Sequence, residues 1–383
     1  MFRIFSTLLI SSSLLVAQDF TKEVAKNDDV SFIDPSDGYF DVSSFLDHPY
    51  GFIPIVNPIT EPAIGEGLAL IPMFVSRPEG QHRPNFTALG AMKTNNGTKG
   101  FFGGYSGYFF DEQLRITAGA TSTSLNLDFY GFGAYDLLDG RSLHYNLDIV
   151  GGLLGAEWRI KDSKWYIGAR YLYGEVDAQL QNQHDFHLLP NGTFLRGIGR
   201  QDTLSSILFE LTHDTRDNVF TPLDGHFAEL SLLWNDELIG ATESFQRLTT
   251  SYYFYQPIVE NTLFFGIKSE AKHNMGDSPF YALPSVQLRG APRTRYQGTT
   301  VAYSESELRW QFHPRWSVLG FGGVGASWGK NSQFDDANTT FTGGTGLRYL
   351  LAKDHSMHVG VDLAYGEEGP AVYIQFGSAW SRP

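Results

Sequence analysis

Hydrophobic and polar residues alternate along much of the chain, most clearly near its C-terminus. One face of the last predicted strand carries Val372, Ile374, Phe376 and Trp380, and Tyr373 lies on the opposite face. Alternation with a period of two indicates a β-strand with one apolar side. The same pattern predicts strands at 65–75, 84–93, 99–109, 113–128, 143–160, 164–180, 203–213, 225–235, 245–257, 261–273, 298–312, 316–328, 341–350, 356–366 and 370–380.

Charged residues occupy one face of several predicted strands. Lys268 and Glu270 alternate with Phe265 and Ile267, and Asp362 alternates with apolar neighbours in the same way. In a transmembrane β-barrel, apolar residues face the lipid and polar residues face the lumen in strict alternation. The chain is therefore predicted to be all-β and to form a single transmembrane antiparallel barrel with these charges inside it.

The number of segments predicts the size of the barrel. Bacterial single-chain barrels have an even number of strands, and the pattern gives fifteen, with Ile53 to Val56 as a candidate sixteenth. We expect 16 strands, with 14 or 12 as alternatives, in a barrel that occupies residues 58–383. Because such barrels have short periplasmic turns, the longest connections are predicted to be extracellular loops, at 181–202, 274–297 and 329–340.

One predicted strand changes phase in its middle. Leu143 and Leu147 lie at odd-numbered positions before Gly151-Gly152, whereas Leu154 and Trp158 lie at even-numbered positions after the two glycines. In an unbroken strand these two sets would face opposite sides. An extra residue or a tight bend would restore a common apolar face, and glycine in a strand often marks such a site. We therefore predict a bulge or bend at Gly151-Gly152.

The N-terminal residues have the features of a secretory signal peptide. Arg3 precedes an apolar run from Ile4 to Val16, and Ala17 supplies the small residue of a cleavage site. The run is shorter than the ~20 residues that a membrane-spanning helix needs. We predict that residues 1–17 are removed on export and that residues 18–57 form a short periplasmic leader or plug.

Composition restricts the classes of protein and site. The chain has no cysteine, so neither a disulfide framework nor a cysteine-ligated metal site is available. Its net charge of −14 argues against a nucleic-acid partner, and no later segment offers the ~18 consecutive apolar residues of a helical span. We predict no cofactor and no metal: His184 and His187 are residues of a type that binds metal ions, but a polar external loop accounts for them equally well.

Two segments near residue 300 carry a family resemblance. Gln287-Leu288-Arg289-Gly290 is followed by Glu305-Ser306-Glu307-Leu308-Arg309-Trp310. The pair resembles the signature of the BamA/TamA-like outer-membrane assembly barrels. Such a resemblance implies a barrel in the outer membrane of a Gram-negative bacterium, with the arginine-glycine pair on a loop folded back into the lumen.

The resemblance also implies that Arg289 docks on acidic residues of the following strands. A guanidinium in a partly desolvated lumen requires a carboxylate partner, and alternation makes Asp362 and Glu307 the expected partners. Where the family has an aromatic residue after the glycine, this chain has Ala291-Pro292. Tyr296 is the candidate to take the place of that aromatic residue.

Two further elements resemble the same superfamily. His213-Asp214-Thr215-Arg216-Asp217-Asn218 precedes Pro222 and Gly225, which suits a periplasmic turn; we interpret Arg216 and Asp217 as structural. The closing strand departs from the usual terminal aromatic residue, so we expect recognition by assembly machinery to use Tyr373, Phe376 and Trp380.

The segment before the barrel is too short for the periplasmic POTRA modules of the assembly family. It resembles the leader of a subgroup that lacks these modules. We hypothesise that Phe40, Phe45 and Phe52 anchor the leader against the periplasmic mouth; a disordered periplasmic tail is the alternative.

Three functions are compatible with these features. The resemblance implies insertion or transport of proteins or lipids at the outer membrane, with outer-membrane lipid and unfolded outer-membrane proteins or a periplasmic partner as the molecules contacted. A passive pore for small solutes is the alternative. A barrel lipid hydrolase that uses His355 and Ser356 is less favoured, because adjacent residues in a turn need not meet, so we do not expect an enzyme or a catalytic residue.

Overall fold

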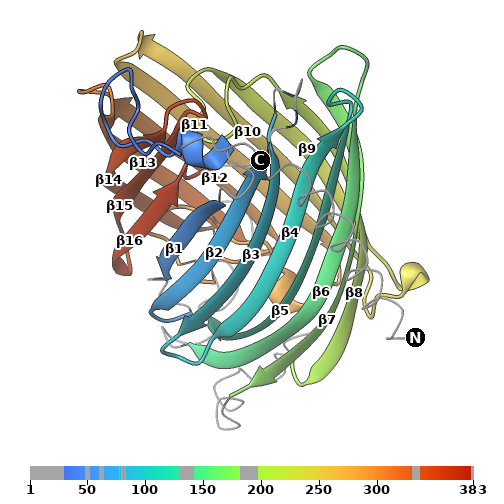
Figure 1. Cartoon of the computed structure of the whole chain (residues 1–383). Coiled ribbons are helices and arrows are strands. Elements are labelled where there is room, and N and C mark those ends of the chain that lie inside the picture. The colour runs from blue at the N-terminus through green and yellow to red at the C-terminus, as the bar shows by residue number, and fades with distance from the viewer. Residues whose placement is uncertain are drawn as a thin grey trace.

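Sixteen antiparallel strands, β1 to β16, pair in chain order and curl into a barrel (Figure 1). The computed structural model describes residues 30–47, 52–59, 64–76, 78, 81, 83–129, 142–181, 197–292, 294–329 and 337–380. This architecture confirms the predicted all-β barrel and its strand number. The strands are β1 (Phe52–Ile59), β2 (Gly67–Ser76), β3 (Asn85–Thr94), β4 (Lys99–Phe109), β5 (Leu114–Phe129), β6 (Leu143–Arg159), β7 (Trp165–Leu180), β8 (Arg200–Asp214), β9 (Gly225–Asn235), β10 (Phe245–Val259), β11 (Leu263–Gly276), β12 (Thr300–Trp310), β13 (Trp316–Trp328), β14 (Asn338–Ala352), β15 (Met357–Gly366) and β16 (Gly369–Phe376).

Helices are few and short in the described ranges: α2 (Ser43–Asp47), η2 (Glu237–Ile239) and η3 (Phe280–Ala282). No helix in this part of the chain is long and apolar enough to cross a membrane.

The candidate sixteenth strand is present in the structure. The predicted segment from Ile53 to Val56 lies within β1, which pairs with β2 over its whole length. The barrel therefore begins at Phe52 rather than at residue 58. The predicted signal peptide and the first part of the predicted leader, up to residue 29, lie outside the described residues, as do His184 and His187.

The two ends of the barrel differ in their connections. The end at which β1 begins and β16 ends carries short turns such as 110–113 and 260–262, and we call it the turn end. The predicted loops at 181–202, 274–297 and 329–340 join β7 to β8, β11 to β12 and β13 to β14, all at the opposite, loop end. Short turns are typical of the periplasmic side of bacterial barrels.

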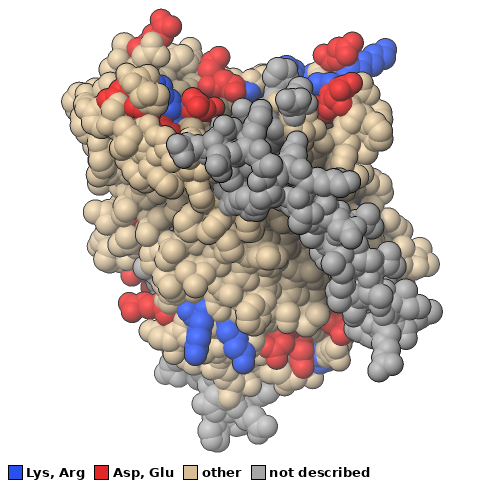
Figure 2. All heavy atoms as spheres, viewed as in Figure 1, with Lys and Arg blue, Asp and Glu red and all other residues tan. Residues whose placement is uncertain are grey.

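The outer wall is apolar between two charged rims. In Figure 2, red and blue residues gather near the top and bottom of the molecule, and the band between them is tan. Large side chains such as Phe101, Leu154, Phe341 and Tyr365 point outward from this band, and Leu154 is 62% exposed. An apolar band that faces outward is typical of a lipid-facing wall.

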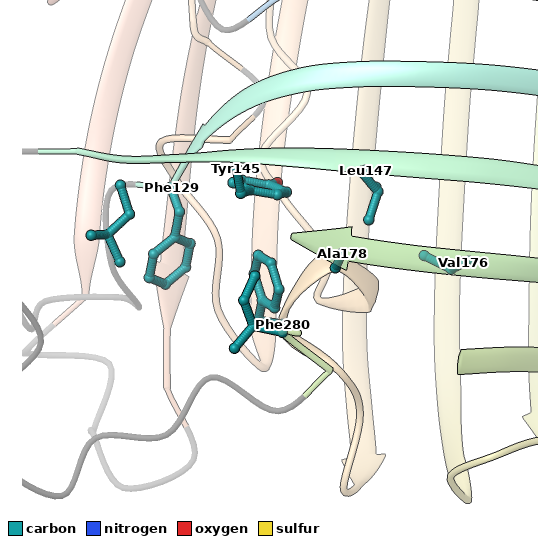
Figure 3. Close-up of a cluster of buried hydrophobic side chains, with 8 residues drawn as sticks. Phe129, Tyr145, Leu147, Val176, Ala178 and Phe280 are labelled. Carbon is teal, nitrogen blue, oxygen red and sulfur yellow. The ribbon is translucent and has the colours of Figure 1, made fainter. Parts of the chain in front are cut away.

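The predicted bulge at Gly151-Gly152 is wrong. Strand β6 is continuous, and its register with both neighbours runs through these glycines without a shift. In its loop-end half, Tyr145 and other inward residues pack on Phe280 of η3, which lies inside the barrel (Figure 3). Apolar residues thus face the lumen at one end of β6 and the lipid at the other, so the pattern changes phase while the backbone does not.

The sheet is not closed by hydrogen bonds. The ladder runs from β1 to β16, and in the described residues no strand pairing joins β1 to β16, although the two strands lie side by side (Figure 1). We call the line between them the seam.

Two prolines weaken the seam edge of β1. Pro54 lies directly opposite Pro72 of β2. Opposed antiparallel residues alternate between hydrogen-bonded and non-hydrogen-bonded pairs, and two prolines cannot exchange N–H bonds, so the nitrogen of Pro54 faces the seam. Pro58 is four residues further along and faces the same way. Two positions that could donate to β16 therefore lack an N–H group.

Candidate functional site in the barrel lumen

The loop between β11 and β12 folds into the barrel and places Arg289 against three carboxylates. Its Nη1 lies 2.8 Å from Asp362 Oδ2, its Nε lies 3.0 Å from Glu305 Oε1, and its Nη2 lies 3.0 Å from Glu307 Oε2. Arg289 is only 7% exposed. The ion pairs expected with Asp362 and Glu307 are both present.

Strand alternation explains why the carboxylates converge. Glu305 and Glu307 are two residues apart on β12 and face the lumen, and Asp362 faces it from β15. Asp362 is fully buried and is also bound by Arg348 of β14, at 2.6 Å from Nη1 to Oδ1. The network therefore joins the loop to β12, β14 and β15.

Glu305 is a partner that the sequence prediction missed. Besides the guanidinium, it accepts the backbone N–H of Arg289 at 3.1 Å. The Phe321 ring of β13 lies under the guanidinium, with 3.6 Å from Cζ to the ring centroid, which adds a cation–π contact. The same alternation that indicated Glu307 also placed Glu305 inward, so the signal for this partner was available.

Gly290 provides the close approach that the loop needs. Its φ is +90°, and a Cβ at this position would lie 3.1 Å from the Tyr365 carbonyl carbon. Its N–H donates to the Tyr373 hydroxyl of β16 at 3.0 Å. A side chain here is therefore strained by the backbone conformation and crowded by β15.

Tyr296 occupies the interior of the same loop. It is buried in a cluster with Val286, Leu288 and Ala291, and its hydroxyl donates to Glu367 at 2.8 Å in the β15–β16 turn. Tyr296 therefore packs beside Ala291 and ties the loop to the last hairpin.

The position of Trp380, after the last strand, differs from the prediction. Strand β16 stops at Phe376, and Trp380, which was expected to share a face with Val372, is instead buried in the lumen among Phe227, Tyr253 and Tyr255. Its Nε1 donates to Glu305 at 2.6 Å. Tyr373 also reaches the Arg289 loop, in agreement with its predicted place on the face opposite Val372, so of these residues Trp380 is the one that departs from its predicted face.

The β8–β9 turn lies across the turn end of the lumen. Arg216 Nε binds Asp214 Oδ1 at 2.9 Å, and Asp217 accepts the N–H of Leu223 at 3.0 Å, as suits a structural role. Gly225 has φ +95°, and a Cβ there would clash with the backbone of Thr215.

The tip of the β8–β9 turn meets the chain end. The Phe220 carbonyl accepts the N–H of Ser378 at 2.6 Å. Pro222 lines a small lumenal cavity with Arg309, Arg348 and Trp380. The turn thus contacts the same part of the lumen as the Arg289 network.

The arrangement is suited to holding strands together. Each of the three carboxylates accepts a hydrogen bond from the Arg289 guanidinium. Through Gly290 and Tyr373 the loop also contacts β16, which borders the seam. His355 and Ser356 lie in the β14–β15 turn at the rim, where the His355 carbonyl accepts from Asn218 at 3.0 Å.

Comparisons with known proteins agree with this architecture. A family model described as the Omp85 superfamily domain matches residues 95–368. No curated protein matches the chain. Among solved structures, BamA from Haemophilus ducreyi lacking POTRA domains 1-3 is similar, with TM-score 0.51 and 13% identity over 84% of this chain and 68% of that chain.

Two CdiB structures are similar as well. CdiB from Escherichia coli gives TM-score 0.56 and 14% identity, and CdiB from Acinetobacter baumannii gives 0.57 and 10%, each over 84% of this chain. This chain spans 61% and 58% of those two chains. At such identities the likeness establishes the shared fold.

Proposed function

This chain belongs to the Omp85 superfamily, and on that premise we propose that it inserts or moves proteins or lipids at the outer membrane of a Gram-negative bacterium. Its direct contacts would be outer-membrane lipid and either an unfolded outer-membrane protein or a periplasmic partner that delivers the substrate. The proposal includes no catalytic residue and no cofactor.

The observation that carries the proposal is the unpaired seam beside a buried ion network. Edge strands present free backbone groups that pair readily with another chain. Here β1 and β16 leave such edges facing one another, and the Arg289 network joins the loop to β12, β14 and β15 on the β16 side of the seam. A protein strand or a lipid could therefore enter at the seam while the rest of the barrel stays intact.

The filled lumen weighs against a passive pore. A barrel of this size encloses an aqueous channel unless it is plugged. In this chain the Arg289 loop, the β8–β9 turn and Trp380 all lie inside, and Trp380 and Arg289 share Glu305 as a partner.

The proposal is tested by the folding rate of an unfolded client barrel into liposomes that contain this protein, compared with empty liposomes. We expect acceleration by the wild type and its loss in Arg289→Ala. The matched control is Arg295→Ala on the same loop, which removes a partly exposed pair with Glu368 of the β15–β16 turn and should retain the activity. Equal rates with and without the protein would contradict the proposal.

A further inference from the structure

The leader segment 30–47 binds the barrel through a buried arginine. Arg315, in the β12–β13 turn, is 1% exposed and contacts three leader carboxylates. Its Nη2 lies 2.7 Å from Asp34 Oδ2, its Nε lies 2.7 Å from Asp37 Oδ2, and its Nη1 lies 2.5 Å from Asp41 Oδ2. We call this group the Arg315 clamp.

The leader is also bound to the end of β14 and to the β14–β15 turn. Val42 donates its backbone N–H to the Leu351 carbonyl at 2.9 Å, and the Tyr349 hydroxyl donates to the Phe40 carbonyl at 2.6 Å. Lys353 Nζ lies 3.0 Å from Asp34. These contacts fix the leader to the strands on the β16 side of the seam.

The other end of the leader packs on the first strands. Phe45 of α2 contacts Phe52, with 6.1 Å between ring centroids, and Phe52 contacts Phe74 of β2 at 5.6 Å. Leu46 of α2 is buried in a cluster that includes Ile53 and Val75 on their inward side. Two of the three phenylalanines expected to anchor the leader do so, whereas Phe40 stacks on Phe32 within the leader.

The leader therefore crosses the seam at the turn end, where α2 lies near the top of Figure 1. On one side it is bound to the turns that follow β12 and β14, and on the other it packs on β1 and β2. Since no hydrogen-bonded pairing joins β1 to β16 in the described residues, the leader supplies a non-covalent connection across this gap.

We propose that residues 30–47 are a latch that holds the seam closed at the turn end and must leave the Arg315 clamp before the seam opens. The inference rests on the proposed function, because it names the control of the opening used there. Leaving the clamp breaks the three ion pairs of Arg315 with Asp34, Asp37 and Asp41 together. The latch is therefore held most firmly while all three carboxylates are ionised.

The seam itself can be measured without a client. The chain has no cysteine, so spin labels placed at Val56→Cys on β1 and Val372→Cys on β16 report one distance across the seam. Arg315→Gln should broaden this distance distribution and shift it to longer values. Asp34→Asn combined with Asp37→Asn is the second variant, in case Arg315→Gln fails to fold, and should have the same effect. An unchanged distribution in a folded variant would overturn the latch.

A reversible disulfide tests whether the latch must be released for activity. A disulfide between Val42→Cys and Leu351→Cys uses two residues that are already joined by a backbone hydrogen bond. The oxidised protein should lose the acceleration of client folding, and reduction should restore it. The control is a cross-link between Ser106→Cys and Thr117→Cys, which face each other on β4 and β5 away from the seam.

The outcomes separate the two proposals. Full acceleration by the oxidised Val42–Leu351 protein would overturn the latch and leave the proposed function intact. No acceleration by any form, together with a seam distance that still responds to Arg315→Gln, would overturn the proposed function and support the latch as a structural device.

Discussion

The indole N–H of Trp380 donates to Glu305 across the lumen, with 2.6 Å between Nε1 and Oε1. The same carboxylate oxygen lies 3.0 Å from Arg289 Nε. A residue four positions beyond the last strand therefore helps to orient the carboxylate that binds the lumenal loop. Because Trp380 follows β16, this contact ties the chain end to β12.

Trp380→Phe tests this connection. A six-membered aromatic ring is retained, but the N–H donor is lost with the five-membered part of the indole, and a hydrogen bond to a charged group contributes about 1.5–3 kcal/mol. We expect a lower free energy of unfolding by this order, measured as a shift in the urea concentration at which the folded band disappears on heat-modifiability gels. Trp380→Leu removes both ring and donor and should cost more. Equal stability of Trp380→Phe and the wild type would contradict the role of the hydrogen bond.

Arg289→Ala should loosen the barrel. The substitution leaves Glu305 and Asp362 buried with one fewer positive partner, and removal of one member of a buried ion pair costs about 3–5 kcal/mol. The same gels should show unfolding at a lower temperature. Arg295→Ala, which breaks the more exposed pair with Glu368, should change stability by only about 0–1 kcal/mol. An unchanged melting profile in Arg289→Ala would count against the network.

Gly290→Ala tests the close approach of the loop to β15. An L side chain is strained at φ +90° and would press on Tyr365, so we expect a loss of about 1–2 kcal/mol from the backbone conformation alone. Gly369→Ala is the matched control for conformation, because Gly369 also has positive φ but open space around its Cβ position. A smaller loss in Gly290→Ala than in Gly369→Ala would contradict the steric argument.

Pro54→Val tests whether proline keeps the seam open. The substitution adds an N–H group that faces β16, and one new hydrogen bond contributes about 0.5–1.5 kcal/mol. We expect a narrower distance distribution between labels on β1 and β16 and slower client folding. Pro72→Val faces β3 instead and should leave the seam distance unchanged.

The latch should withstand mild acid and release in strong acid. Hydrogen bonds from Ser36 lower the pKa of Asp34 from its usual value of 3.8, and hydrogen bonds from Arg315 lower the pKa of Asp37. For Asp41, burial works to raise the pKa, but hydrogen bonds from Arg315 and Ser43 outweigh it and lower the pKa.

Groups with a lowered pKa stabilise the folded state above their unfolded value and lose this effect as the pH falls through the folded value. The seam distance should therefore be constant from about pH 8 to pH 5 and widen only below about pH 4. His313 contacts Tyr39 of the leader, so His313→Gln separates its protonation from that of the carboxylates. Widening already at pH 6 in His313→Gln would contradict the carboxylate account.

Alternation made the barrel predictable from sequence. A membrane barrel has an apolar outer face along every strand. The outward side of each segment can therefore be predicted from its own residues, without knowledge of distant contacts. The fifteen predicted segments overlap β2 to β16. Only β1 was uncertain, because Pro54 and Pro58 are unusual in a strand and are tolerated here at a sheet edge.

The filling of the lumen could not be predicted in the same way. The inward apolar residues of β6 pack on Phe280, which is more than 130 residues away in sequence, and no local pattern reports such a partner. Trp380 lies at an even-numbered position, like Val372 of the closing strand, and was therefore assigned to the same face, although the strand ends at Phe376. The Arg289 network was predicted because the family resemblance implied a lumenal arginine loop and alternation placed Glu307 and Asp362 inward, whereas the additional partner Glu305 was missed because the path of the loop was unknown.

The Arg289 network and the Arg315 clamp both act on the β16 side of the seam. The Arg289 network joins β12, β14 and β15, and the turns after β12 and β14 receive the leader. Strands β12 to β15 are therefore joined by side-chain contacts inside the lumen and by the leader at the turn end, and we expect them to move as one rigid unit. Strands β1 and β2 carry no charged side chain, so no ion pair braces the other edge of the seam, and β1 is the edge that we expect to move.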